Sequence, residues 1–408
     1  MMKSKRDFPM VRVTKKAEKS LKDGHPWVYD TEITESEECE NGSLVDIFSQ
    51  KGSYLGTGFI SLNSKIRIRR LSDNANERFE DDFFARRVKY AVDYRRTVMR
   101  DDFSSCRLIF GEADGLPGLT VDKYEDLLSV QVLSYGMEQK KDVVYKALCG
   151  ELAAHGVNVR GIMERNDVAI RKLEGLDEYK AWYRADYLPE PPSPVVEITE
   201  NGITYSVDIE NGQKTGFFLD QKYNRRAVLE LAKDMTVLDC FTHTGSFGLN
   251  AAMGGAAHVT SVDVSQTAVD MAKANASRNG LSDRIDYLCT DVFELLPKLC
   301  EEHITYDLVI LDPPAFTKSR KTVGNARSGY KEINYRAMKL LRRGGYLATC
   351  SCSHFMETRM FEKMLAEAAH DAGVGLRIIE ERAQAPDHPI LMGVPETSYL
   401  KFFLLQIV

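Results

Sequence analysis

The sequence lacks several features that would assign it to a class at once. No apolar run in its 408 residues is long enough to span a bilayer. The basic start, Met1 to Arg12, has no apolar stretch typical of a secretory signal. The eight cysteines are scattered over a long chain without a secretion signal, so no disulfide framework is expected, and they include no C-x-x-C pair typical of a zinc site. The G-x-G-x-x-G turn of nicotinamide enzymes is also absent. We therefore expect a cytoplasmic protein with reduced thiols and no metal.

The composition is that of a globular protein with more than one domain. Hydrophobic residues make up 43% and charged residues 28% of a chain longer than one ordinary domain. The net charge of −6 argues against a basic surface overall, although a local basic face could still bind nucleic acid. Lys65, Arg67 and Arg69 alternate along a predicted strand and would share one face. That face would contact nucleic acid or belong to a solvated edge strand, and both interpretations are open.

Turn residues and a proline cluster divide the chain into three predicted domains. Residues 1–73 contain short strand patterns and a basic helix pattern, which predict a small β-barrel. Residues 74–188 predict a small α+β domain without a catalytic constellation. Four prolines in the six residues 189–194 favour extended backbone and mark the next boundary. Residues 189–408 alternate strand and helix patterns, which predicts a mainly parallel sheet.

Acidic residues follow successive predicted strands of this third domain. They are Asp239, Asp263, Asp291 and Asp312. Ligands of parallel sheets bind at the carboxyl ends of the strands, where these acids fall. Asp239 opens a turn that contains Gly245, Asp263 could accept hydrogen bonds from both ribose hydroxyls, and Asp291 fits a position beside an adenine ring. A single such acid could be a helix cap, but four in sequence predict an adenosine cofactor.

A second constellation has the residue types needed to methylate a pyrimidine. Asp312-Pro313-Pro314-Ala315-Phe316 follows an apolar run and is typical of the segment that meets the target base in base methyltransferases. Cys350 and Cys352 end a later predicted strand. A thiolate that adds to carbon 6 of a pyrimidine makes carbon 5 able to accept a methyl group. The alternative is two structural cysteines, since free cysteine is often buried.

Six segments together resemble the ribosomal RNA large subunit methyltransferase I family. They are T-G-F-F-L-D-Q (215–221), V-L-D-C-F-T-H-T-G-S-F (237–247), L-D-P-P-A-F (311–316), S-C-S (351–353), Q-A-P-D-H-P (384–389) and P-E-T-S-Y-L-K (395–401). The resemblance implies an α/β fold: a C-terminal Rossmann-like class I methyltransferase domain, an N-terminal PUA-like β-barrel and a small central α+β domain. It also implies 5-methylcytidine formation in large-subunit ribosomal RNA. It places the nucleophile on Cys352, whereas the context of Cys350 resembles another group of RNA cytosine methyltransferases. Both cysteines therefore stay candidates, with Asp312 as their catalytic neighbour.

The resemblance also implies S-adenosylmethionine as cofactor and ribosomal RNA as partner. The predicted cofactor-binding residues are Thr215, Phe218, Gln221, Asp239, Phe241, Gly245, Asp263, Asp291 and Asp312. No membrane contact is expected, and a homodimer is left open. Two other functions are left open as well: methylation of a purine nitrogen in RNA with structural cysteines, and RNA binding without catalysis.

Overall fold

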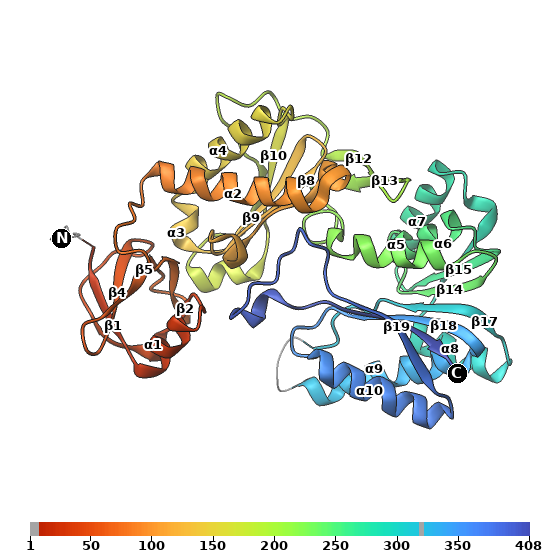
Figure 1. Ribbon diagram of the computed structural model, residues 1–408. Coiled ribbons are helices and arrows are strands. Elements are labelled where there is room, and N and C mark those ends of the chain that lie inside the picture. Colours follow the sequence, from red (N-terminus) through yellow and green to blue (C-terminus); the bar gives the residue numbers. More distant parts are fainter. Residues whose placement is uncertain (1–7, 318–321) are drawn as a thin grey trace. The chain divides into compact units, whose positions relative to one another are not determined.

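The computed structural model describes residues 8–317 and 322–408, which form two compact units (Figure 1). The first unit comprises the residues up to Ile198 together with Val207–Leu219 and Pro386–Thr397. The second comprises Thr199–Ser206, Asp220–Ala385 and Ser398–Val408. Residues 1–7 of the basic start lie outside the described residues, and the three-domain division stays a prediction. Among the described helices, none is long and apolar enough to cross a membrane.

The first unit begins with a six-stranded sheet in the order β2-β6-β5-β4-β1-β3. Its strands are β1 (Met10–Val13), β2 (Trp27–Tyr29), β3 (Ile33–Ser36), β4 (Leu44–Ser49), β5 (Tyr54–Ile60) and β6 (Ile66–Ser72). All neighbours are antiparallel except β1 and β4. The core of this sheet consists of apolar side chains from alternating strand positions and from helix α1 (Lys15–Lys22). The buried faces of strand and helix therefore follow their own periodicities of two and 3.6 residues.

The edge-strand interpretation of β6 is wrong, and the expected basic face of Lys65, Arg67 and Arg69 does not extend to Arg69. Strand β6 lies between β2 and β5, so both of its edges are paired. Arg69 is only 7% exposed, and its Nη2 lies 2.8 Å from Oε1 of Glu174. Its guanidinium also lies over the Trp27 ring. Because the sheet packs against other parts of the same unit, the guanidinium of Arg69 forms a buried ion pair and does not contribute to a charged surface.

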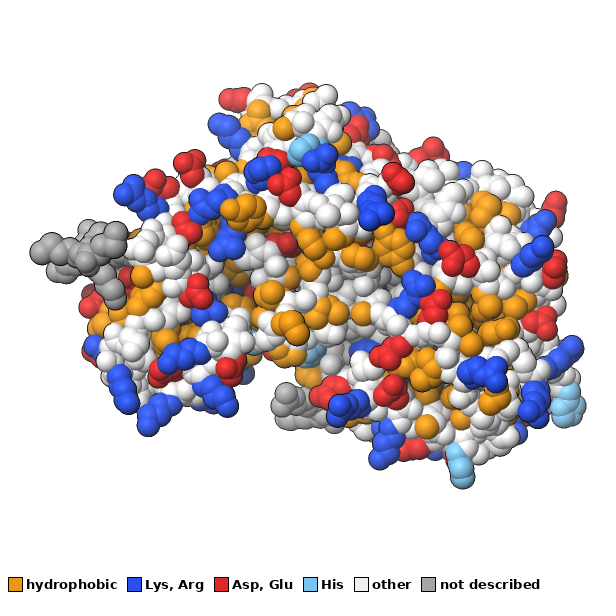
Figure 2. Space-filling model, viewed as in Figure 1, with side chains coloured by type: hydrophobic (Ala, Val, Ile, Leu, Met, Phe, Trp, Pro, Cys, Tyr) orange, Lys and Arg blue, Asp and Glu red, His pale blue; other side chains and the backbone are white. Residues whose placement is uncertain are grey.

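Helix α1 carries the exposed positive charge of this sheet region instead. Its buried face consists of Ala17 and Leu21, and its four lysines are exposed: Lys15, Lys16, Lys19 and Lys22. Blue side chains gather at the corresponding lower-left edge of Figure 2. Lys16 pairs with Glu32 and Lys22 with Glu18, whereas the described residues give Lys15 and Lys19 no ion-pair partner. A surface with several exposed lysines attracts polyanions electrostatically.

The first unit also contains a five-stranded sheet in the order β11-β10-β9-β8-β7. Its strands are β7 (Ser105–Phe110), β8 (Leu119–Tyr124), β9 (Leu127–Val132), β10 (Gly161–Asn166) and β11 (Tyr179–Trp182). Helices α2 (Asp81–Met99), α3 (Tyr135–Glu138) and α4 (Lys141–Ala154) accompany it. Helix α2 packs on α4 and on β7. A mixed sheet with helices on it is the α+β arrangement predicted for the middle of the chain.

The second unit is built on a seven-stranded sheet in the order β16-β15-β14-β17-β18-β20-β19 (Figure 1). Its strands are β14 (Thr236–Cys240), β15 (His258–Asp263), β16 (Ile285–Cys289), β17 (Tyr306–Leu311), β18 (Leu341–Ser351), β19 (Leu376–Arg382) and β20 (Lys401–Ile407). Five neighbouring strands are parallel, and β20 runs antiparallel between β18 and β19. The strand order reverses between β14 and β17, where ligands of such sheets bind.

Helices cover this sheet in two groups. They are α5 (Lys222–Leu231), α6 (Ser246–Met253), α7 (Gln266–Arg278), α8 (Val292–Glu301), α9 (Val323–Lys339) and α10 (Thr358–Ala372). Helix α6 packs on β14 and β15, whereas α9 packs on β17 and β18 beside α8 and α10. The last four residues of β17 are fully buried, as expected for a strand covered on both faces. The parallel sheet predicted from the sequence is confirmed.

A hairpin of β12 (Val195–Glu200) and β13 (Ile203–Asp208) precedes this sheet in the chain. The turn residues Asn201 and Gly202 both have positive φ, at 53° and 80°. Two left-handed residues in succession favour the tight hairpin turn that the sequence predicts, because asparagine and glycine tolerate this conformation best.

Candidate functional site

Asp239 is the buried anchor of the turn after β14. Its Oδ2 accepts hydrogen bonds from the backbone nitrogen of Gly248 at 2.8 Å and from Oγ1 of Thr242 at 2.5 Å. Gly248 allows this contact because a Cβ there would lie 2.8 Å from the same oxygen. Burial raises the pKa of Asp239 to about 7, and the charge of Asp312 acts in the same direction. The carboxyl group therefore ties the start of α6 to the end of β14.

The turn itself has an unusual backbone. Phe241 and His243 have positive φ angles of 64° and 49°, and Gly245 follows at 84°. Non-glycine residues in this region are strained and persist where surrounding contacts hold them, often at binding sites. A Cβ on Gly245 would lie 3.0 Å from Cβ of Ala272, so a larger residue would press on α7. The sequence predicted this turn from its glycines but not the left-handed residues at 241 and 243.

Asp263, at the end of β15, holds the same turn from the neighbouring strand. Its Oδ2 accepts from the backbone nitrogen of His243 at 2.9 Å, and its Oδ1 accepts from that of Ser265 at 2.9 Å. The N-cap of α7 is Ser265, whose side chain accepts from Ala268. Asp263 is therefore not the cap of that helix. Each of its oxygens keeps a second lone pair for a hydroxyl group of a ligand.

Asp291 has a different environment from the other three acids. It is the N-cap of α8, and its Oδ1 accepts from the backbone nitrogen of Phe293 at 2.8 Å. The capping alternative considered for a single acid therefore applies at this position. The side chain is exposed, and its place beside an adenine ring stays a prediction.

Asp312 directly follows β17 and is held by an amide side chain. Gln221 Nε2 donates to Asp312 Oδ1 at 2.9 Å. The amide of Gln221 is oriented in turn, because Asn224 Nδ2 donates to its Oε1 at 2.7 Å. Asn224 was missed at the sequence level, where only its position three residues after Gln221, at the start of a predicted helix, could have indicated it. Gln221 and Asp312, both predicted cofactor-site residues, are thus brought together.

The two candidate cysteines differ in their surroundings. Cys350 lies inside β18, paired with Phe402 of β20, and is 0% exposed. Burial raises the pKa of Cys350 well above its usual value, and the charge of Asp312 adds to this effect. Cys352 lies just beyond the end of β18, is half-buried, and has its Sγ 4.0 Å from the carbonyl oxygen of Pro313. Reactive thiols are partly exposed and close to cations, which favours Cys352 over Cys350.

Lys401 and Tyr330 complete the surroundings of Cys352. Burial has the largest influence on the pKa of both groups, and Cys352 raises both values. Lys401 belongs to the P-E-T-S-Y-L-K segment, which was singled out in the sequence without a role for its lysine. Tyr330 lies on α9, and nothing in the sequence pattern pointed to it. These two residues reach Cys352 only through the pairing of β20 with β18 and the packing of α9.

Thr215 and Phe218, two of the predicted cofactor-binding residues, belong to the first unit, where they contact other residues of that unit. Thr215 is buried, and its hydroxyl donates to Oδ2 of Asp122 on β8. The guanidinium of Arg107 holds the same carboxylate through two contacts of 2.7 Å. Lys214 places its ammonium group 4.6 Å from the centroid of the Phe218 ring. The role of both residues in cofactor binding stays a prediction.

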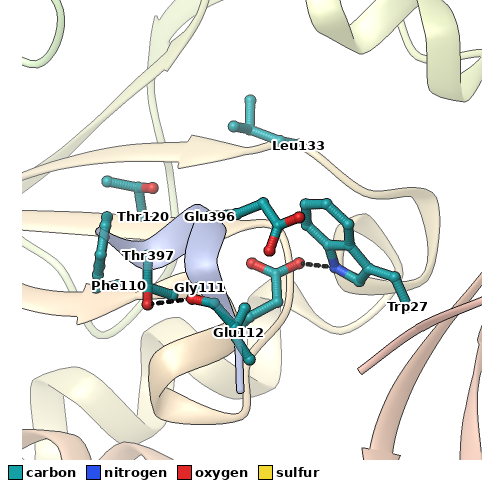
Figure 3. A pocket seen from close by; sticks show the side chains of 10 residues that line it. Trp27, Phe110, Gly111, Glu112, Thr120, Leu133, Glu396 and Thr397 are labelled. Carbon is teal, nitrogen blue, oxygen red and sulfur yellow. Dashed lines mark hydrogen bonds between the residues drawn. The ribbon is translucent and has the colours of Figure 1, made fainter. Parts of the chain in front are cut away.

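A separate hollow of about 170 Å³ lies within the first unit (Figure 3). Trp27 and Phe110 line it together with Glu112 and Glu396. The indole Nε1 of Trp27 donates to Glu112 Oε1 at 2.8 Å. Outside the hollow, Glu396 Oε2 lies 3.1 Å from Nε2 of His25. The segment 24–27, with the sequence G-H-P-W, therefore contacts Glu396, which is distant in the chain.

Acidic and histidine side chains come close together elsewhere on the same unit. Asp93, Glu151 and His155 lie on or beside α2 and α4 within reach of one another. Lys89 Nζ lies 3.0 Å from Asp93 Oδ2 and 3.3 Å from Glu151 Oε1. Arg96 also contacts the ring of His155. These contacts make the group a surface ion-pair network.

Comparisons with known proteins agree with this arrangement. Residues 168–405 match the family model of S-adenosylmethionine-dependent methyltransferases, and residues 11–73 match a PUA-like domain. Proteins named ribosomal RNA large subunit methyltransferase I are similar over nearly their whole length. The one from Aliivibrio fischeri is 41% identical over 98% of this chain and 99% of its own. The one from Aeromonas salmonicida is 43% identical over 97% of this chain and 98% of its own.

Solved structures share the fold. A chain from Streptococcus mutans described as a SAM-dependent methyltransferase has a TM-score of 0.81 at 24% identity and covers 97% of this chain and 99% of its own. A methyltransferase complexed with SAH gives the same values. The turn after β14 and the acids at the switch point suit the adenosine and methionine parts of such a cofactor. The chain therefore belongs to the ribosomal RNA large subunit methyltransferase I family and is an S-adenosylmethionine-dependent methyltransferase with a PUA-like domain.

Proposed function

We propose that the protein methylates carbon 5 of a cytidine in large-subunit ribosomal RNA in the cytoplasm, with Cys352 as nucleophile. The curated relatives are named for this RNA, and we carry the substrate over to the chain. The observation that carries the choice of chemistry is the half-buried thiol of Cys352 at the carbonyl of Pro313, next to Asp312. The D-P-P segment and the thiol would then meet the same base.

The proposed reaction needs two groups besides this chain's cysteine: S-adenosylmethionine, which would leave as S-adenosylhomocysteine after giving up its methyl group, and a base that accepts the proton of carbon 5. The Cys352 thiolate adds to carbon 6 of cytosine, forming a sulfur–carbon bond and making carbon 5 electron-rich. S-adenosylmethionine supplies the methyl group that carbon 5 accepts. A base then removes the proton from carbon 5, and the electrons of that bond expel the thiolate from carbon 6. Asp312, oriented by Gln221, would hydrogen-bond the nitrogen edge of the cytosine ring during these steps.

Cys350 has a structural role in this proposal. Its thiol is fully buried and has a raised pKa, so a thiolate there is unfavourable. It lies inside β18, paired with Phe402 of β20, and the charge of Asp312 acts on its thiol. Replacing it by alanine should alter packing more than chemistry.

Helix α1 supports an RNA-binding role for the PUA-like domain. Its exposed lysines form the positive face described above, and Lys15 and Lys19 have no ion-pair partner among the described residues. Phosphate contacts by such lysines add affinity that does not depend on sequence. We place the RNA backbone on this helix rather than on β6.

The experiment is covalent trapping with ribosomal RNA that contains 5-fluorocytidine. The fluorine at carbon 5 cannot leave as a proton does, so the adduct through Cys352 should accumulate. We expect the wild type and Cys350→Ala to form the complex, and Cys352→Ala to form none. Full methylation by Cys352→Ala would overturn the thiol mechanism. Nucleoside mass spectrometry of the RNA product distinguishes 5-methylcytidine from a methylated purine, and the absence of any methyl transfer would favour a binding factor.

A further inference from the structure

Lys401 lies directly beside the segment that carries Cys352. It opens β20 and is paired with Ser351, the last residue of β18. Its Nζ donates to the carbonyl oxygen of Ser353 at 2.5 Å and to that of Tyr399 at 2.8 Å. Because Ser353 directly follows Cys352, the ammonium group is fixed to the backbone that positions the thiol.

The ammonium group of Lys401 is buried without a carboxylate partner. Its residue is 6% exposed, and the hydrogen bonds and ion pairs of residues 8–317 and 322–408 give it the two carbonyl acceptors only. Carbonyl dipoles satisfy two of its three N–H donors but supply no negative charge. A buried cation without a counter-ion is strongly unfavourable, so the site favours an anion nearby.

The thiol of Cys352 can supply that anion. Burial lowers the pKa of Lys401 to about 8, whereas Cys352 acts in the opposite direction and raises it. The mutual attraction that favours the ammonium form of Lys401 must favour the thiolate form of Cys352 equally.

Among the described residues, Cys350, Tyr330, Asp312 and His354 are further ionisable groups around Cys352. On β18, Cys350 has a pKa well above its usual value because of burial. On α9, burial raises the pKa of Tyr330 to about 12. Asp312, after β17, is an acid held by Gln221. His354 follows Ser353, and its Nδ1 lies 3.3 Å from the carbonyl oxygen of Ser398.

We propose that Lys401 is a positioning residue that stabilises the Cys352 thiolate as an ion pair and so prepares the nucleophile. This inference rests on the proposed function, which makes Cys352 the nucleophile. The neutral Lys401 amine takes the thiol proton, so that –SH and –NH₂ become –S⁻ and –NH₃⁺ without any other reactant. The thiolate electrons then form the bond to carbon 6, while the proton stays on Lys401. When elimination releases the thiolate, the same ion pair forms again.

The test measures the ionisation of Cys352 itself. The full chain is alkylated with iodoacetamide from about pH 5 to about pH 10, and peptide fragmentation in the mass spectrometer separates Cys352 from Cys350. For the wild type we expect a midpoint below the value of about 8.5 of an ordinary thiol. Lys401→Met should raise the midpoint and slow alkylation near neutral pH about tenfold, which corresponds to a shift of one pKa unit. Lys401→Arg keeps a positive charge and should keep the midpoint low.

Lys363→Met provides the matched control, because Lys363 lies exposed on α10. Its midpoint should equal that of the wild type. An unchanged midpoint in folded Lys401→Met would overturn the inference. If Lys401→Met does not fold, the alkylation midpoint of Cys352 in the wild type is the test. A midpoint at or above about 8.5 would also overturn the inference. Alkylation does not require methyl transfer, so failure of this inference can be distinguished from failure of the proposed function. An unchanged alkylation midpoint would overturn the role of Lys401, whereas full methylation by Cys352→Ala would overturn the role of Cys352.

Discussion

Gln221, at the start of α5, donates a hydrogen bond from Nε2 to Oδ1 of Asp312, at the end of β17, over 2.9 Å. The residues are 91 positions apart, and the contact orients the carboxylate that follows the buried strand. Asn224 fixes the direction of the Gln221 amide, so the donor rather than the carbonyl oxygen faces Asp312. The relationship connects a segment singled out for cofactor binding with the segment expected to meet the base.

Gln221→Leu should therefore lower methylation more than stability. A hydrogen bond to a charged group contributes about 1.5–3 kcal/mol, so kcat/KM should fall by roughly ten- to a hundredfold. Steady-state methylation and thermal unfolding are measured together. Gln406→Leu is the control. Gln406 lies near the C-terminal end of β20, at the opposite end of the strand from Lys401. Equal activity losses in the two variants would contradict the role assigned to Gln221.

Asp239 should make the stability of the cofactor-free protein depend on pH. Its folded pKa of about 7 is above the value of about 3.9 in the unfolded chain, so its contribution to folding is full only below about pH 4 and is lost as pH rises from there to about 7. Asp239→Asn is neutral at every pH and keeps an oxygen acceptor for Gly248 and Thr242. We expect the variant to gain stability relative to the wild type between about pH 5 and about pH 8, by on the order of a few kcal/mol.

Denaturant unfolding at the two pH values measures this difference. Asp283→Asn, at an exposed position before β16, is the control and should show no comparable gain. If the stability difference between Asp239→Asn and the wild type is the same at both pH values, Asp239 does not titrate in this range.

The lysines of α1 should contribute to RNA affinity through phosphate contacts. Lys15→Gln with Lys19→Gln should weaken binding of different RNA sequences to a similar extent, since backbone contacts carry no sequence information. The slope of log affinity against log salt should become less steep by about one unit per lysine. Filter binding at several salt concentrations measures both quantities.

The matched variant for this experiment is Lys16→Gln, because Lys16 pairs with Glu32 at 2.9 Å. It should change the salt dependence less than either Lys15→Gln or Lys19→Gln. An unchanged slope in the double variant would show that the RNA backbone lies elsewhere.

Local sequence patterns predicted the sheet of the second unit well. The apolar runs before Asp239, Asp263 and Asp312 become neighbouring parallel strands, since each strand–helix unit returns the chain to the same edge. The patterns predicted the strand-end position of Asp291 too, but its cap bond to Phe293 depends on where α8 begins. The prediction that Arg69 lies on a basic face failed for a different reason. Strand alternation predicts that side chains share a face, but whether solvent or Glu174 covers that face depends on packing across 105 residues.

The sequence by itself determined the fold class, the family and the placing of acids at successive strand ends, because these depend on periodicity and on spacing within single strand–helix units. Only the tertiary structure shows that Cys350 is buried and Cys352 half-buried. The two differ by one strand period and would share a face, yet β18 ends at Ser351, so that Cys350 lies inside the sheet, paired with Phe402 and fully buried, while Cys352 lies beyond the paired strands. The same pairing brings Lys401 to Cys352 across 49 residues of chain. Spacing along the chain cannot encode that contact, because strand register and burial arise from the whole sheet.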